Sequence, residues 1–155
     1  MKYFVLYLFF IVGFCQSQVK SISSLINLVE NGKDDTIKVK RLNLLCELFT
    51  NDGNTDSALI YGNTSLKLAL KLNFKRGIST ACSGLGVALF DVHNYSEAMN
   101  YHQKALKIDE AIGNLKDIPV HLANIGKAYL EQNNQQQGLD YYMRALKLIE
   151  QSGSK

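Results

Sequence analysis

The stretch Leu122-Ala-Asn-Ile-Gly-Lys-Ala-Tyr129 decides the fold, because its pattern recurs forty residues earlier as Cys82-Ser-Gly-Leu-Gly-Val-Ala-Leu89. A third version, Leu42-Asn-Leu-Leu-Cys-Glu-Leu-Phe49, precedes both at the same interval. Each version is followed by a second segment that has a small residue at the same place: Ala58, Ala98 and Gly138. A fixed period of this length is typical of a solenoid, in which stacked repeats bury a continuous core.

Apolar residues recur at helical spacing from Ser21 onward, which predicts an all-α chain. We expect one lone helix near 22–29, followed by the antiparallel pairs 36–49 with 55–72, 75–92 with 96–112, and a third pair that ends near 131 and 151. Gly32 is expected to end the first helix, and Thr55 or Asp56 to cap the third. Asp117 can cap the sixth helix, with Pro119 in its first turn, where a missing N–H is tolerated.

The N-terminal segment has the layout of a secretory signal peptide. Lys2 is followed by an uncharged apolar run over residues 3–14, which is too short to cross a bilayer as a helix. We expect residues 1–17 to be removed after Ser17, or alternatively after Cys15, and an uncleaved membrane anchor stays open. Loss of Lys2 lowers the formal charge from +3 to +2. With lysines and acids interspersed, this balance argues against a nucleic-acid partner.

These segments resemble the tetratricopeptide repeat family, which pairs a first helix of type W-x2-L-G-x2-Y with a second of type A-x3-F-x2-A. The third pair gives Leu122-x2-Ile125-Gly126-x2-Tyr129, then Gly138-x3-Tyr142-x2-Ala145. The forty-residue length resembles the repeats of kinesin light chains and of bacterial sensor-kinase input regions. The resemblance implies a right-handed α-solenoid with a half repeat at 18–34 and repeats at 35–74, 75–114 and 115–155.

The resemblance also implies a structural seam of small and large residues, in which small residues allow close helix approach and large ones fill the space between pairs. The seam residues are Leu45, Cys46, Phe49, Ala58, Leu85, Gly86, Leu89, Ala98, Ala105, Ile125, Gly126, Tyr129, Gly138, Tyr142 and Ala145. Periodic tyrosines on the second helices are expected to pack between pairs: Tyr61, Tyr101, Tyr141 and Tyr142.

No nucleophile motif, phosphate loop or metal-ligand spacing occurs, so we expect neither an enzyme nor a cofactor or metal site. Cys46 and Cys82 occupy packed positions and are expected to act as small hydrophobes, although an even count leaves a disulfide open. His102 is expected to pack in the seam, His93 to lie in a turn, and His121 to be half exposed. The acids Asp109, Glu110 and Glu150 are expected on solvated faces.

The resemblance implies a concave groove, lined by first helices, that holds a peptide or protein segment. The matching residues are Asn43, Glu47, Ser83, Val87, Phe90, Asn124, Lys127 and Leu130. We therefore expect an exported interaction module of the bacterial periplasm or cell envelope. The alternative is the sensor region of a split or truncated signalling protein, which the end of the array at Gly153-Ser154 favours. The same uncapped end predicts a possible homo-oligomer.

Overall fold

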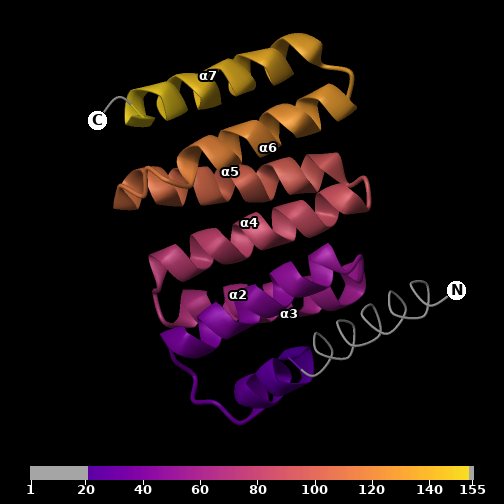
Figure 1. Cartoon of the computed structure of the whole chain (residues 1–155), viewed down its shortest axis with the longest axis vertical. Helices are drawn as coiled ribbons and strands as arrows, with labels where there is room; N and C mark the ends of the chain where they lie inside the picture. The colour runs from indigo at the N-terminus through magenta and orange to yellow at the C-terminus, as the bar shows by residue number, and fades with distance from the viewer. Residues whose placement is uncertain (1–20, 154–155) are drawn as a thin grey trace, which may run out of the picture.

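The computed structural model describes residues 21–153, and the expected signal peptide over 1–17 lies outside this range. Residues 21–30 are helical, and six further helices follow in the described part: α2 (Thr36–Asn51), α3 (Thr55–Lys71), α4 (Lys75–Asp91), α5 (Tyr95–Ile112), α6 (Ile118–Glu131) and α7 (Gln135–Gly153) (Figure 1). The predicted all-α class is confirmed, and the predicted helix bounds agree within about two residues. None of these helices is long and apolar enough to cross a membrane.

The helices form a solenoid in which each one packs against the next along the chain (Figure 1). The first helices of successive pairs also contact each other, α2 with α4 and α4 with α6. Among α2–α7, the second helices α3, α5 and α7 make no such contacts with one another. The stack is therefore tighter on the side of α2, α4 and α6, and this side is the inner, concave one.

The turns between helices repeat every twenty residues. Among the described residues, five have positive φ, between 50° and 74°: Gly53, Asn73, His93, Gly113 and Asn133. In each turn the next residue donates its backbone N–H to a carbonyl five residues earlier, at 2.8–3.0 Å. This is the Schellman arrangement, which satisfies the carbonyls left free at a helix end. The same backbone turn therefore joins helices within a pair and between pairs.

Two predicted caps are wrong, and a third is confirmed in part. Gly32 does not adopt positive φ, so it is not a left-handed cap. Asn54 caps α3 in place of Thr55 or Asp56, because the twenty-residue turn places Asn54 first and its side chain accepts the Ser57 N–H at 3.1 Å. α6 begins after Asp117, which makes no side-chain cap bond, and has a proline in its first turn as predicted.

The core lies between the helix layers and contains most of the predicted seam. Twelve of the seam residues are buried, and Phe49, Tyr129 and Tyr142 are half buried. Tyr61 stacks on Phe49 with ring centroids 5.4 Å apart, and Tyr141 stacks on Tyr129 at 5.5 Å. Both stacks join the two helices of one pair, α2 with α3 and α6 with α7, and not two successive pairs, where these tyrosines were predicted to pack.

Gly126 and Gly138 allow the closest approach of α6 and α7. A Cβ atom built on Gly126 would lie 2.9 Å from the backbone oxygen of Gly138, and one built on Gly138 would lie 3.0 Å from the oxygen of Gly126. These distances are shorter than ordinary van der Waals contact, and backbone atoms cannot move aside as a side-chain tip can. The two helices therefore require glycine at both positions.

We expect Gly126→Ala to lower the free energy of unfolding by about 1–3 kcal/mol, and Gly126→Leu by more, because each overpacks this contact. Helix propensity alone predicts the opposite sign, a gain of about 1 kcal/mol for alanine over glycine. Urea unfolding of the two variants decides between these effects. A stabilised Gly126→Ala variant would contradict the close packing of α6 on α7.

Candidate functional site: the groove along the first helices

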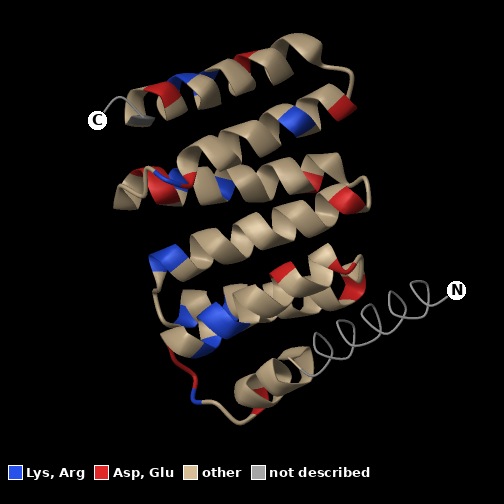
Figure 2. Cartoon of the chain, viewed as in Figure 1, with Lys and Arg blue, Asp and Glu red and all other residues tan. Residues whose placement is uncertain are grey.

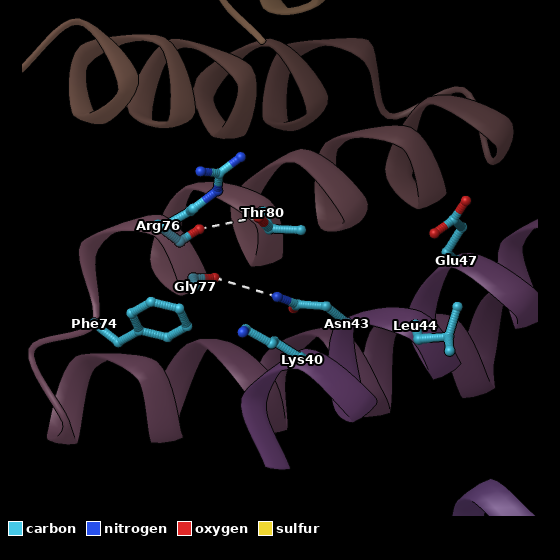
Figure 3. Close-up of a pocket in the computed structure, with 8 residues that line it drawn as sticks. All are labelled: Lys40, Asn43, Leu44, Glu47, Phe74, Arg76, Gly77 and Thr80. Carbon is cyan, nitrogen blue, oxygen red and sulfur yellow. Dashed lines mark hydrogen bonds between the residues drawn. The ribbon is translucent and has the colours of Figure 1, made fainter. Parts of the chain in front are cut away.

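Two adjoining hollows lie between α2 and α4 on the concave side. One has a volume of about 210 Å³ and is drawn in Figure 3, with Lys40, Asn43 and Leu44 from α2 facing Arg76, Gly77 and Thr80 from α4. The other has a volume of about 310 Å³ and continues toward the C-terminal ends of the two helices. Both share Asn43, Glu47 and Thr80, so they form one groove, which we call the α2–α4 groove.

Four of the eight predicted groove residues line the α2–α4 groove: Asn43, Glu47, Ser83 and Val87. The other four lie in or near α4 and α6 and line neither hollow: Phe90, Asn124, Lys127 and Leu130. Lys127 places its ammonium 4.0 Å from the Phe90 ring centroid, a cation–π contact that joins α6 to α4. The structure therefore brings the predicted residues together in two groups along the same concave side.

Asn43 is held in place by hydrogen bonds to its own protein. Its amide nitrogen donates to the backbone oxygen of Gly77 at 3.4 Å, and its Oδ1 lies 2.6 Å from the Ser65 hydroxyl. These bonds link α2 to α3 and α4 across the floor of the groove. One amide hydrogen and one lone pair of Oδ1 on Asn43 are not used by these bonds.

Charge is unevenly distributed along the α2–α4 groove. Lys40 and Arg76 lie at one end with Phe74, while Glu47 lies toward the other end (Figure 3). Neither Lys40 nor Arg76 forms an ion pair within the described residues. Basic residues gather near the N-terminal ends of α2 and α4, as the blue segments in Figure 2 show. Lys40 and Arg76 were not among the predicted groove residues, although both are basic residues near the starts of first helices.

A buried polar cluster lies between α4, α5 and α6, centred on Asp109. This carboxylate accepts hydrogen bonds from the Ser79 hydroxyl at 2.7 Å, from His121 Nε2 at 2.8 Å and from the Asn114 amide at 3.1 Å. Asp109 is 0% exposed and His121 is 2% exposed. The predicted solvated place of Asp109 and half-exposed place of His121 are therefore wrong. Three donors from other segments replace the water that the carboxylate loses.

The order of the hydroxyl, imidazole and carboxylate groups in this cluster differs from their order in a hydrolytic triad. In a hydrolytic triad, the imidazole lies between the hydroxyl and the carboxylate and takes the hydroxyl proton. Here the carboxylate lies in the middle, so the Ser79 hydroxyl donates to Asp109 and not to His121. Within the described residues no group of three or more His, Cys, Asp or Glu side chains could hold a metal ion.

A second buried histidine, His102, lies beside this cluster. His102 is buried and its ring centroid lies 6.0 Å from that of His121. Burial, and secondarily the neighbouring His121, lower the pKa of His102 to about 4. The predicted packing of His102 in the seam is confirmed, and exposed His93 lies in a turn as predicted.

Cys46 and Cys82 are separate, buried free thiols. Burial raises the pKa of each thiol to about 11. Because the thiolate is the reactive form, both cysteines are poor nucleophiles in the folded protein. Their predicted role as small hydrophobes is confirmed.

The same helical-repeat architecture occurs in known proteins. Residues 80–151 match the family model of the tetratricopeptide repeat. No curated protein matches the chain in sequence. Among solved structures, the tetratricopeptide repeat domain of FLU from Arabidopsis aligns with a TM-score of 0.69 at 21% identity, covering 73% of this chain and 95% of that domain.

Two longer proteins share the same fold. The apo form of RapI aligns with a TM-score of 0.82 at 14% identity, covering 94% of this chain and 54% of RapI. A signal transduction ATPase with numerous domains from Pyrococcus horikoshii, which has a tetratricopeptide repeat sensor, aligns with a TM-score of 0.75 at 21% identity, covering 93% of this chain and 23% of that protein. This chain therefore spans about half of RapI and about a quarter of the ATPase.

The family model covers most of the second and third helix pairs, and the fold of these structures extends the likeness to the first pair. The forty-residue motif and the contacts between first helices agree with both. Residues 80–151 therefore match the tetratricopeptide repeat family, and the described chain has the fold of a tetratricopeptide repeat solenoid, a fold suited to protein–protein interaction.

Proposed function

We propose that this protein binds a peptide or protein segment in the α2–α4 groove, and that the segment carries an acidic group. The observation that supports this most directly is the pairing of a hollow with two basic side chains that lack acidic partners within the described residues, Lys40 and Arg76. The groove also offers apolar contact, because Leu44 and Val87 are partly exposed along it. A mixed surface of this kind suits an extended segment that presents both apolar and charged side chains.

The second group of groove residues extends the same surface. Thr80 and Ser83 line hollows on both sides of α4, toward α2 and toward α6. A segment lying across α4 would therefore meet the α2–α4 groove first and the Asn124–Lys127 face of α6 next. The Asn124 side chain forms no hydrogen bond within the described residues and keeps a donor and an acceptor for a ligand backbone.

The double variant Lys40→Ala/Arg76→Ala should weaken partner binding about ten-fold, because each partly exposed ion pair contributes about 0.2–1 kcal/mol. Partners are first captured from cell-envelope extract and identified, and a synthetic segment of the partner is then titrated by fluorescence anisotropy. The variant Asn124→Ala tests the second group in the same way.

The matched control is Lys67→Ala/Lys107→Ala, which removes two exposed lysines from the outer helices α3 and α5. This control changes the net charge by the same amount but leaves the groove intact. Equal losses in the control and in Lys40→Ala/Arg76→Ala would indicate a general charge effect and would reject the groove.

We also propose that the protein is exported to the periplasm or cell envelope. The support is the order of Lys2, the apolar run over 3–14 and the small residues near Ser17. The mature chain then begins at Gln18, and intact-mass measurement of the protein from each cell fraction tests this. A protein that retains Met1 and stays in the cytoplasm would reject export.

A further inference from the structure

α7 exposes a stripe of apolar side chains along one side. Leu139, Met143, Leu146 and Ile149 are between 54% and 68% exposed. Their spacing of four, three and three residues keeps them on one side of the helix. α7 lies at one end of the stack in Figure 1, and among α2–α7 it contacts α6 alone.

The preceding repeat shows what such a stripe is built to contact. Met99 and Leu106 of α5 occupy the places that Leu139 and Leu146 occupy in α7, forty residues later. Leu106 is buried, and both residues belong to a cluster with Ile118 of the next helix, α6. The same positions that are exposed on α7 are thus covered by a helix on α5. We therefore expect the α7 stripe to pack against a helix.

We propose that this helix is α7 of a second copy of the chain, packed antiparallel about a two-fold axis. The flanking charges support this occupant. Asp140 and Lys147 are both exposed and lie seven residues, or two helical turns, apart beside the stripe. When two antiparallel helices place Met143 opposite the second copy's Leu146, each Asp140 lies beside the second copy's Lys147. The symmetry makes two such ion pairs, so the edge of the stripe is complementary to itself.

The charge pattern distinguishes a second copy from a lipid surface. Helices that lie on membranes carry basic residues along the polar face beside the apolar one. α7 carries both signs there, with Asp140, Arg144 and Lys147 exposed. Asp140 accepts a hydrogen bond from Gln136 at 3.1 Å, an exposed contact that leaves its other oxygen available. The opposite charges of Asp140 and Lys147 therefore suit a second copy of α7 better than a lipid surface.

The test is sedimentation equilibrium of the purified protein as the cell produces it, over a range of micromolar concentrations. The protein is expected to dimerise, and Met143→Glu to remain monomeric with unchanged helical circular dichroism. The single variants Asp140→Lys and Lys147→Asp turn both attractive pairs into repulsive ones. Each is expected to raise the dimer dissociation constant about ten-fold at low salt.

Mixing the two single variants provides the decisive measurement. A heterodimer of Asp140→Lys with Lys147→Asp has two opposite-charge pairs again, so the mixture is expected to associate as tightly as the wild type. The matched control is Lys107→Asp, which changes the equivalent lysine of α5 and should leave dimerisation unchanged. A monomer at all concentrations overturns the proposal, as does a mixture that associates no better than its components. Binding of the monomer to lipid vesicles through Met143 would assign the stripe to a membrane instead.

Discussion

Replacing Asp109 by leucine should lower the free energy of unfolding by about 3–5 kcal/mol, the range for removing one partner of a buried charged network. Leucine fills most of the space but accepts no hydrogen bond. The Ser79 hydroxyl, His121 Nε2 and the Asn114 amide would then lose their shared acceptor inside the core. Each unpaired buried donor costs about 1–3 kcal/mol, and some of that cost is recovered if a donor turns toward water.

Two variants separate this network from simple packing. Glu110→Leu changes the exposed neighbour on the same helix and should alter stability by less than about 0.5 kcal/mol. The triple variant Ser79→Ala/Asp109→Leu/His121→Leu removes donors together with the acceptor. It should recover much of the stability lost in Asp109→Leu, since an apolar replacement leaves few groups unpaired. Chemical denaturation of all four proteins measures these differences, and a fully stable Asp109→Leu variant would refute the role of the network.

The protein should lose about 2 kcal/mol of stability between pH 7.5 and pH 5 through His102 alone. The pKa of His102 is about 4 in the folded protein, against an ordinary value of 6.5. Between these values the unfolded chain binds a proton at His102 and the folded chain does not. The contribution of His102 to the free energy of unfolding is therefore fully present above about pH 6.5 and is lost as the pH decreases toward 4.

The cause of this pH dependence is the place of His102 in the core. Charging its ring would put a cation in a buried site beside His121, which in turn contacts Asp109. Exposed carboxylates affect stability mainly at lower pH; the pKa of Asp34, for example, lies below its ordinary value of 3.8 because of Lys38 and Lys71. The window from pH 6.5 to 5 therefore reports on buried histidine.

Urea unfolding at pH 5 and pH 7.5 tests this prediction. His102→Phe keeps a planar ring in the core but cannot titrate, so its stability should change by about 2 kcal/mol less than that of the wild type over this interval. His93→Asn is the matched control, because His93 is exposed and asparagine tolerates positive φ. A wild-type slope that persists in His102→Phe would assign the pH dependence to another group.

The repeat pattern predicted the helices well because each helix depends on local signals. Apolar spacing, small seam residues and polar turns lie within one half repeat of each other, so Gly126 and Tyr129 could be placed without tertiary information. The alignment of repeats contains a further signal of burial. Asp109 occupies the register of Ala69, which is 0% exposed, and His121 occupies that of Ala81, which is 1% exposed.

The polar cluster could not be predicted from its own neighbourhood. Asp109 is followed by Glu110 and preceded by Lys107, which is the usual pattern of a solvated helix face. The groups that satisfy its carboxylate come from α4, from the turn before α6 and from α6 itself. Only the packed structure brings these segments together. The groove was predicted in outline, but the bonds that hold Asn43 and the basic end at Lys40 and Arg76 depend on the contact between α2 and α4.

The twenty-residue spacing of the turns has a consequence for how such an array can grow. The backbone repeats after one helix, whereas the side chains repeat after two, because inner and outer helices alternate. Inserting a single helix with its turn would preserve every joint but reverse the parity of all helices beyond it, so that groove-lining sequences would move to the convex side. The length of the array can therefore change only by an even number of helices if the concave face is to remain continuous.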